Sequence, residues 1–131
     1  MVLKIACATD DGINFISRHF GDAKKYLIFV YDDNSKKFIF QEEVENKPFK
    51  EKHDGDPKKA NFISNILKPK GINILMNKAL GPNIVRMRQK FAIVISRIDN
   101  IEEALSKIDI NFIINELKKE EGIDKEILYV K

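Results

Sequence analysis

A histidine, a phenylalanine and a glycine stand side by side at His19-Phe20-Gly21, just before a long apolar run. An imidazole can ligate a metal ion and can also donate hydrogen bonds to an anion. A buried phenylalanine ring would anchor the segment, and a glycine lets a ligand approach the backbone or lets the chain adopt a positive φ. Arg18 and Lys25 add positive charge nearby. The triplet therefore predicts a metal or anion site; the alternative is a surface histidine beside a phenylalanine that only fills the core.

A second candidate is Gly81-Pro82-Asn83, which lies between a predicted strand and a predicted helix. Proline is common at the first helical position, and the free N–H groups of a helix start attract anions. The segment therefore predicts either an anion contact or an ordinary helix start.

Carboxylates provide two further candidates. Asp10 and Asp11 follow the first predicted strand, where paired carboxylates could hold divalent ions for phosphodiester hydrolysis. Such a site needs further acids, and none stands at a distinctive spacing, so a plain turn is the alternative. In the segment KHDGD, His53, Asp54 and Asp56 could form a site for a hard cation or a solvated loop.

These residues must be positioned by an alternation of strands and helices. Continuous or alternating apolar runs predict strands over 2–8, 26–31, 37–44, 72–76 and 91–96. Apolar residues at helical spacing predict helices over 60–67, 82–90, 101–108 and 110–117. Asp99 followed by Glu102 has the spacing of a capping box.

The order of these elements predicts the sheet. The short turn over 32–35 favours an antiparallel hairpin, and the later alternation of helices and strands implies parallel pairing. A mixed five-stranded sheet with helices on its faces follows, an α/β fold. The loop over 13–24 then leaves the carboxyl end of a central strand, where ligands gather in such sheets. The tail 122–131 is either an added edge strand or a flexible end.

Composition limits the function classes. The chain has 131 residues, 44% of them hydrophobic, which fits a single domain over residues 1–131. Its net charge of +3 comes without a dense Lys/Arg stripe, which argues against a dedicated nucleic-acid binder. The single cysteine, Cys7, falls inside a predicted buried strand and favours a core role in a reducing cytoplasm. No apolar stretch approaches the roughly 20 residues of a membrane span.

Four segments carry a family resemblance: IACATDDG, SRHFGDAKKYLIFVYD, INILMNKALGPNIVRMRQKFAIVI and IDNIEEAL. Together they resemble the dinitrogenase iron–molybdenum cofactor biosynthesis family, of the NifX and NifB C-terminal domain type, over roughly residues 2–108. The resemblance implies a ribonuclease H-like three-layer fold, with a C-terminal helical extension from about residue 109. It also implies that His19 and Gly21 correspond to the family's histidine and glycine.

Family members linked to nitrogen fixation bind iron–sulfur or iron–molybdenum cofactor precursors. We therefore expect a non-enzymatic cytoplasmic carrier whose partners are the metal cofactor and cofactor-biosynthesis proteins, with no membrane and no nucleic-acid partner. The expected metal ligand is His19, and the expected cofactor-binding residues are His19, Phe20, Gly21, Arg18, Lys25, Gly81 and Asn83. Two alternatives stay open: a metal-dependent nuclease or phosphohydrolase of ribonuclease H-like fold using Asp10, and an interaction domain without a ligand.

Overall fold

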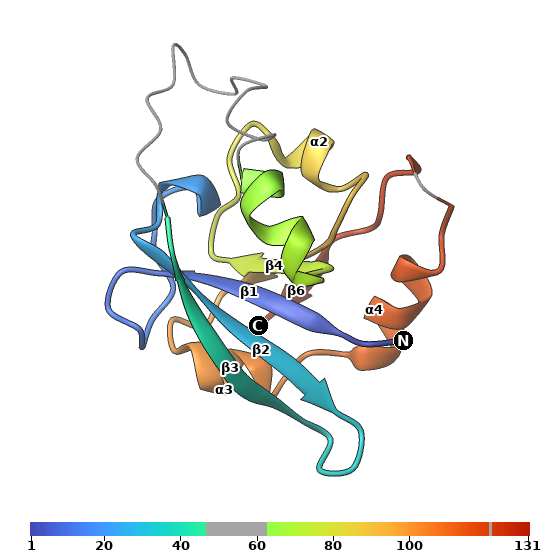
Figure 1. Ribbon diagram of the computed structural model, residues 1–131, viewed down its shortest axis with the longest axis horizontal. Coiled ribbons are helices and arrows are strands. Elements are labelled where there is room, and N and C mark those ends of the chain that lie inside the picture. Colours follow the sequence, from blue (N-terminus) through green and yellow to red (C-terminus); the bar gives the residue numbers. More distant parts are fainter. Residues whose placement is uncertain (47–62, 121) are drawn as a thin grey trace.

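The computed structural model describes residues 1–46, 63–120 and 122–131, and its centre is one mixed β-sheet (Figure 1). Within the described residues the sheet has six strands in the order β3-β2-β1-β4-β5-β6. Their bounds are β1 Lys4–Thr9, β2 Lys25–Asp32, β3 Lys37–Glu45, β4 Ile74–Asn77, β5 Ala92–Ser96 and β6 Leu128–Val130. All five predicted strands are present, with ends shifted by one or two residues.

The pairing of the strands agrees with the sequence except at one edge. β2 pairs antiparallel with both β1 and β3, so the predicted hairpin is confirmed. β1, β4 and β5 are parallel, as the alternation of helices and strands predicts. The predicted count of five strands is corrected to six, because the tail adds β6 parallel to β5.

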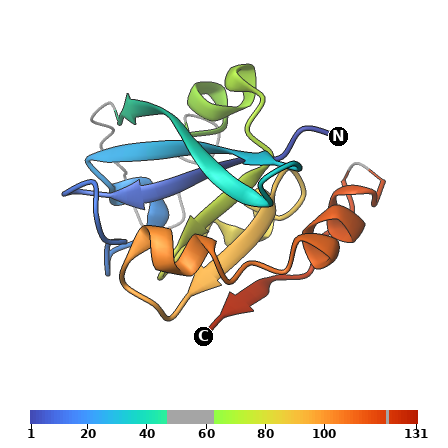
Figure 2. The same cartoon turned by 90° about the horizontal axis from the view of Figure 1, so that it is seen from below.

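Helices cover both faces of the sheet and make three layers (Figure 2). One face packs against the helical residues 63–67 and against α2 (Ile84–Met87). The other packs against α3 (Ile101–Leu105) and α4 (Ile110–Leu117). Successive strand residues point to opposite faces, so β1 contributes apolar side chains to both cores, which is why its sequence is apolar throughout.

The two helices on the second face begin at side-chain caps. Asn100 accepts a hydrogen bond from the Glu103 N–H at 2.9 Å, and Asp109 caps α4 in the same way. The predicted cap at Asp99 is therefore wrong by one residue, because the Asp99 carboxylate pairs instead with Lys78 at 2.7 Å. No helix in the described part of the chain is long and apolar enough to cross a membrane.

Candidate functional site

Three loops meet where the carboxyl ends of the parallel strands lie, which is called the carboxyl edge of the sheet below. β1, β4 and β5 run parallel, so the loops that follow them, residues 10–24, 78–83 and 97–100, leave from the same side. The first and third loops are joined by backbone hydrogen bonds from the Phe15 N–H to the Asp99 carbonyl and from the Ile101 N–H to the Ile13 carbonyl. This is the edge at which ligands bind in open α/β sheets.

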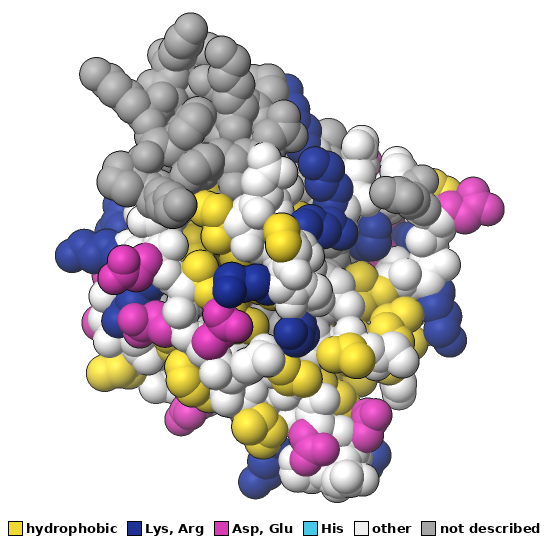
Figure 3. Space-filling view, in the orientation of Figure 1, with side chains coloured by type: hydrophobic (Ala, Val, Ile, Leu, Met, Phe, Trp, Pro, Cys, Tyr) yellow, Lys and Arg dark blue, Asp and Glu magenta, His cyan; other side chains and the backbone are white. Residues whose placement is uncertain are grey.

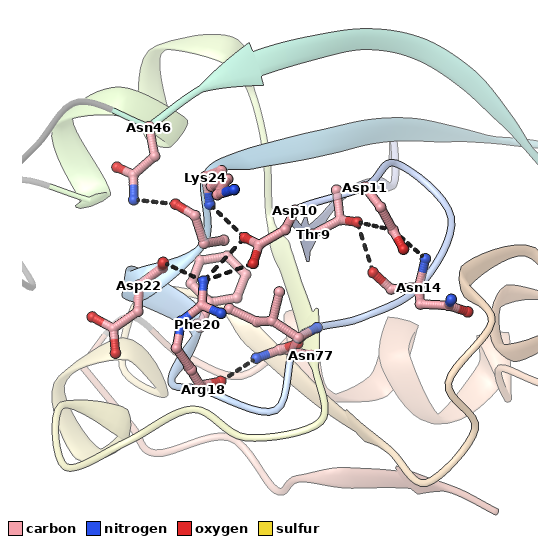
Figure 4. Close-up of polar contacts among 12 residues, drawn as sticks. Thr9, Asp10, Asp11, Asn14, Arg18, Phe20, Asp22, Lys24, Asn46 and Asn77 are labelled. Carbon is pink, nitrogen blue, oxygen red and sulfur yellow. Dashed lines mark hydrogen bonds and ion pairs between the residues drawn. The ribbon is translucent and has the colours of Figure 1, made fainter.

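Asn77 fastens the first loop to the second (Figure 4). It is the last residue of β4 and is fully buried. Its Oδ1 accepts from the Ile16 N–H at 3.2 Å, and its Nδ2 donates to the carbonyls of Arg18 and Ala79 at 3.0 and 2.7 Å. Sequence reasoning missed this role, and the available signal was an amide side chain ending an otherwise apolar strand.

His19 lies directly against Gly81, so two of the predicted site segments meet. Gly81 has a φ of +83°, and a Cβ there would lie 2.7 Å from His19 Cγ and 2.8 Å from Nδ1. Only glycine is compatible with both this conformation and this contact. The His19 side chain remains exposed. The imidazole packs against the Gly81 backbone and is open to solvent, so a ligand arriving from solution can contact it.

Phe20 anchors the His19 loop to the core, as predicted. Its side chain is 2% exposed and stacks on Tyr26 with ring centroids 4.8 Å apart. The Tyr26 hydroxyl donates to the Phe20 carbonyl at 3.0 Å. Burial raises the pKa of Tyr26, with a further rise from the charge of Asp22, so this phenol stays protonated and keeps donating. Phe20–Asp22 form one turn of 3-10 helix directly after His19, and this turn fixes the direction of the His19 side chain.

Gly21 was expected either to let a ligand approach the backbone or to adopt a positive φ, and the second of these is not found. The described glycines with positive φ are Gly12, Gly71, Gly81 and Gly122, so the positive φ considered for Gly21 is not found. A 3-10 turn uses negative φ, which explains the difference. The Gly21 carbonyl accepts from Asn46 Nδ2 at 2.9 Å, and the same amide donates to the Ala23 carbonyl. Asn46 thereby ties the turn to the end of β3 (Figure 4).

The two cations expected at the site are both neutralised by carboxylates. Arg18 Nη2 contacts Asp10 Oδ2 at 2.9 Å and also donates to the Asp22 carbonyl. Lys25 pairs with Glu43 at 3.0 Å and lines a groove beside α3, on the face away from Phe20. The structure therefore places Arg18 next to the His19 loop and does not bring Lys25 together with His19.

Asp10 and Asp11 are both used inside the loop. Burial tends to raise the pKa of Asp10, but the Lys24 N–H and Arg18 outweigh it and lower that pKa below its usual value. The N–H groups of Asn14 and Ile13 lower the pKa of Asp11. The described part of the chain contains no group of three or more His, Cys, Asp or Glu side chains that could hold a metal ion. The carboxylates thus act here as hydrogen-bond acceptors that shape the loop.

The remaining candidates lie at or beyond the limits of this site. α2 spans only four residues after Asn83, so the helix predicted to reach Lys90 provides little dipole for an anion. The Asn83 Oδ1 accepts from Arg86 Nη1 at 3.0 Å. Cys7 is fully buried, which raises the pKa of its thiol and keeps it a core residue. His53, Asp54 and Asp56 lie outside the described residues.

Comparison with known proteins decides the family. The family model described as dinitrogenase iron-molybdenum cofactor matches residues 1–109. The chain belongs to this family. Its matched region includes β1 to β5, the His19 loop, Gly81 and α3, so the whole edge described above is the family's part of the molecule. α4 and β6 follow the matched region. No curated protein and no solved structure matches the chain.

Proposed function

We propose that this protein is a non-enzymatic carrier of an iron–sulfur or iron–molybdenum type cluster, with His19 as the side chain that ligates the cargo. Membership of the dinitrogenase iron-molybdenum cofactor family supports involvement with that cofactor or its precursors. The observation that carries the residue assignment is the exposed imidazole resting on Gly81 at the carboxyl edge of the sheet. Cytoplasmic location, delivery to cofactor-biosynthesis proteins and a ribonuclease H-like fold belong to the same proposal.

The donor set suits cargo rather than a resident cofactor. A resident cluster is normally held by several thiolates, and the only cysteine is buried in β1. One imidazole can complete the coordination of a cluster whose other metal sites already carry ligands. Such binding is weak enough to reverse, which a carrier requires.

The charges around His19 favour an anionic cargo only moderately. Arg18 is committed to Asp10, and Lys78 is committed to Asp99. An incoming anion would have to compete with these carboxylates for the two cations. We therefore expect affinity to come mainly from ligation by His19, and the salt dependence of binding to be shallow.

An anaerobic titration tests the proposal. Metal-free protein would be titrated at pH 7.5 with a synthetic thiolate-ligated iron–sulfur cluster and, separately, with isolated iron–molybdenum cofactor, followed by visible absorption. Replacing His19 by alanine should weaken binding about 10-fold or more, which corresponds to roughly 1.4 kcal/mol. The chain has two histidines, so His53→Ala is a control of identical chemistry. Unchanged affinity in His19→Ala would remove His19 from the site, and no binding by any form would favour the interaction-domain alternative.

A further inference from the structure

A pocket lined mainly by residues with polar side chains lies at the end of the sheet opposite His19. It has a volume of about 440 Å³ and is formed by the helical residues 63–67, the segment before β5 and the segment before β6. Four lysines line it: Lys68, Lys90, Lys119 and Lys125. Figure 3 shows lysine and arginine side chains gathered on this face of the molecule, beside the helical residues 63–67 and α2.

Two of these lysines have no counter-charge within the described part of the chain. Lys68 Nζ donates to the Lys90 carbonyl at 3.0 Å and lies 4.8 Å above the centre of the Phe91 ring. Its contacts are thus a neutral carbonyl and an aromatic face, and no described carboxylate lies within ion-pair distance of Lys68 or Lys90. No described residue lining the pocket is an aspartate or a glutamate. The wall therefore carries a net positive charge.

Lys125 lies near the other pocket lysine, Lys119, and these two share the Glu116 carboxylate, which pairs with Lys119 at 2.6 Å and has its pKa lowered by both lysines. Lys125 is only 5% exposed, and its Nζ donates to the Gln89 carbonyl at 3.3 Å. Two hydrogen bonds fix its backbone. The Lys125 N–H donates to the Arg88 carbonyl, and Arg88 Nε donates to the Lys125 carbonyl at 2.7 Å. These contacts hold the segment before β6 against the segment before β5, so the two segments that line the pocket keep their places relative to one another.

Ser64 supplies an independent sign of a ligand. The residue lines the same pocket, is 5% exposed, and its Oγ has no hydrogen-bond partner within the described residues. Buried hydroxyl groups are almost always hydrogen-bonded, because leaving one unpaired is costly. An acceptor entering the pocket would supply the missing partner.

We propose that this pocket binds the phosphate group of a small phosphorylated molecule. A phosphate dianion has several acceptor oxygens, and lysines bind it as point charges while hydroxyl groups satisfy the remaining lone pairs. Lys68 and Lys90 provide the charge, and Ser64 provides the hydroxyl. The site is separate from the His19 edge and does not depend on what that edge carries.

The test is an NMR titration of the full chain with inorganic phosphate and with ribose 5-phosphate, at constant ionic strength maintained with chloride. Saturable shifts are expected at the amides of 64–68 and 89–91 with both probes. Tighter binding of the ester would assign the site to a phosphorylated metabolite, and equal or tighter binding of inorganic phosphate would overturn that assignment. Ser64→Ala should weaken binding severalfold without any change in charge.

The charge contribution needs a matched control. The double variant Lys68→Gln/Lys90→Gln should weaken binding at least 10-fold. Lys36→Gln/Lys37→Gln removes the same charge at the exposed hairpin turn and should change binding less than twofold. Equal losses in both, or the absence of saturable shifts in wild type, would overturn the proposal. Should the pocket variant fail to fold, acetylation of wild-type Lys90 should be slowed by phosphate while that of Lys37 is not, and equal rates would also overturn it.

Discussion

The contact between His19 and Gly81 makes a sharp prediction about Gly81→Ala. The new Cβ would lie 2.7 Å from His19 Cγ and 3.0 Å from His19 Cβ. These atoms are at the root of the side chain, so rotation of the ring cannot relieve the overlap and the loop itself must move. We expect both a loss of stability and a displaced imidazole.

The size of the effect has two parts. A non-glycine residue in the left-handed region costs roughly 1–2 kcal/mol, of which about 0.4–1 kcal/mol is offset because alanine restricts the unfolded chain. Overpacking against His19 adds roughly 1–3 kcal/mol. The sum is a loss of about 2–4 kcal/mol, of which about 1 kcal/mol would appear at any glycine with this backbone conformation.

Gly71→Ala isolates the second part. Gly71 has a φ of +79°, but the nearest atom to its new Cβ would be Lys4 Cδ at an ordinary 3.7 Å. Urea denaturation should show Gly81→Ala as the more destabilised variant by at least 1 kcal/mol. Adding His19→Ala to Gly81→Ala should recover part of that excess, because it removes the contacts with Cγ and Nδ1 and keeps the one with Cβ. Equal losses in the two glycine variants, or no recovery in the double variant, would refute the contact.

Four further results are expected. Asn77→Leu leaves the Ile16 N–H and two carbonyls unpaired, so it should cost roughly 2–4 kcal/mol in urea denaturation and speed hydrogen exchange at Ile16; unchanged exchange would contradict the fastening role. Ile28→Ala, at a fully buried position, should cost roughly 2–5 kcal/mol, whereas Ile39→Ala, at a half-exposed one, should cost under about 1 kcal/mol, and similar losses would contradict the sheet assignment. Because the pKa of Asp10 is lowered, its ionised carboxylate stabilises the fold above about pH 4, and this stabilisation is lost at lower pH. The free energy of unfolding of Asp10→Asn should therefore depend less steeply on pH in the acid range than that of wild type. Incubation with Mg²⁺ or Mn²⁺ and single-stranded, duplex or hybrid nucleic acids should give no turnover, and turnover abolished by Asp10→Ala would make this protein an enzyme.

Strands could be predicted from the sequence where burial on both faces makes the whole strand apolar. β2 and β5 are continuous apolar runs because both of their faces are covered, and no helical spacing competes with that pattern. β6 could not be assigned, since three residues carry no periodicity and their pairing depends on the free edge of β5. The end of α2 was also missed, because the Met87 carbonyl accepts from both Lys90 and Phe91 and the chain turns there.

The candidate site was predictable in its residue types and not in its contacts. His19, Phe20 and Gly81 were identified because each has chemistry that the local order emphasises. The pairing of Arg18 with Asp10 and the link from Asn77 to Ile16 join residues 8 and 61 positions apart. Such partners are set by the meeting of loops at the sheet edge, which a single sequence does not encode in any local pattern. Of the two expected cations, Arg18 therefore pairs with Asp10 in the His19 loop, and Lys25 pairs with Glu43 away from His19.

The arrangement of His19 is easier to explain by binding than by stability. Its side chain makes no hydrogen bond within the described residues and is exposed, so it adds little to the free energy of folding. Yet its position demands a glycine in a left-handed conformation at residue 81, where any Cβ would overlap the imidazole. Local choices that cost stability without a structural return are expected at functional sites. That imbalance is the physical reason for proposing this imidazole, rather than the carboxylates beside it, as the ligand of the proposed cargo.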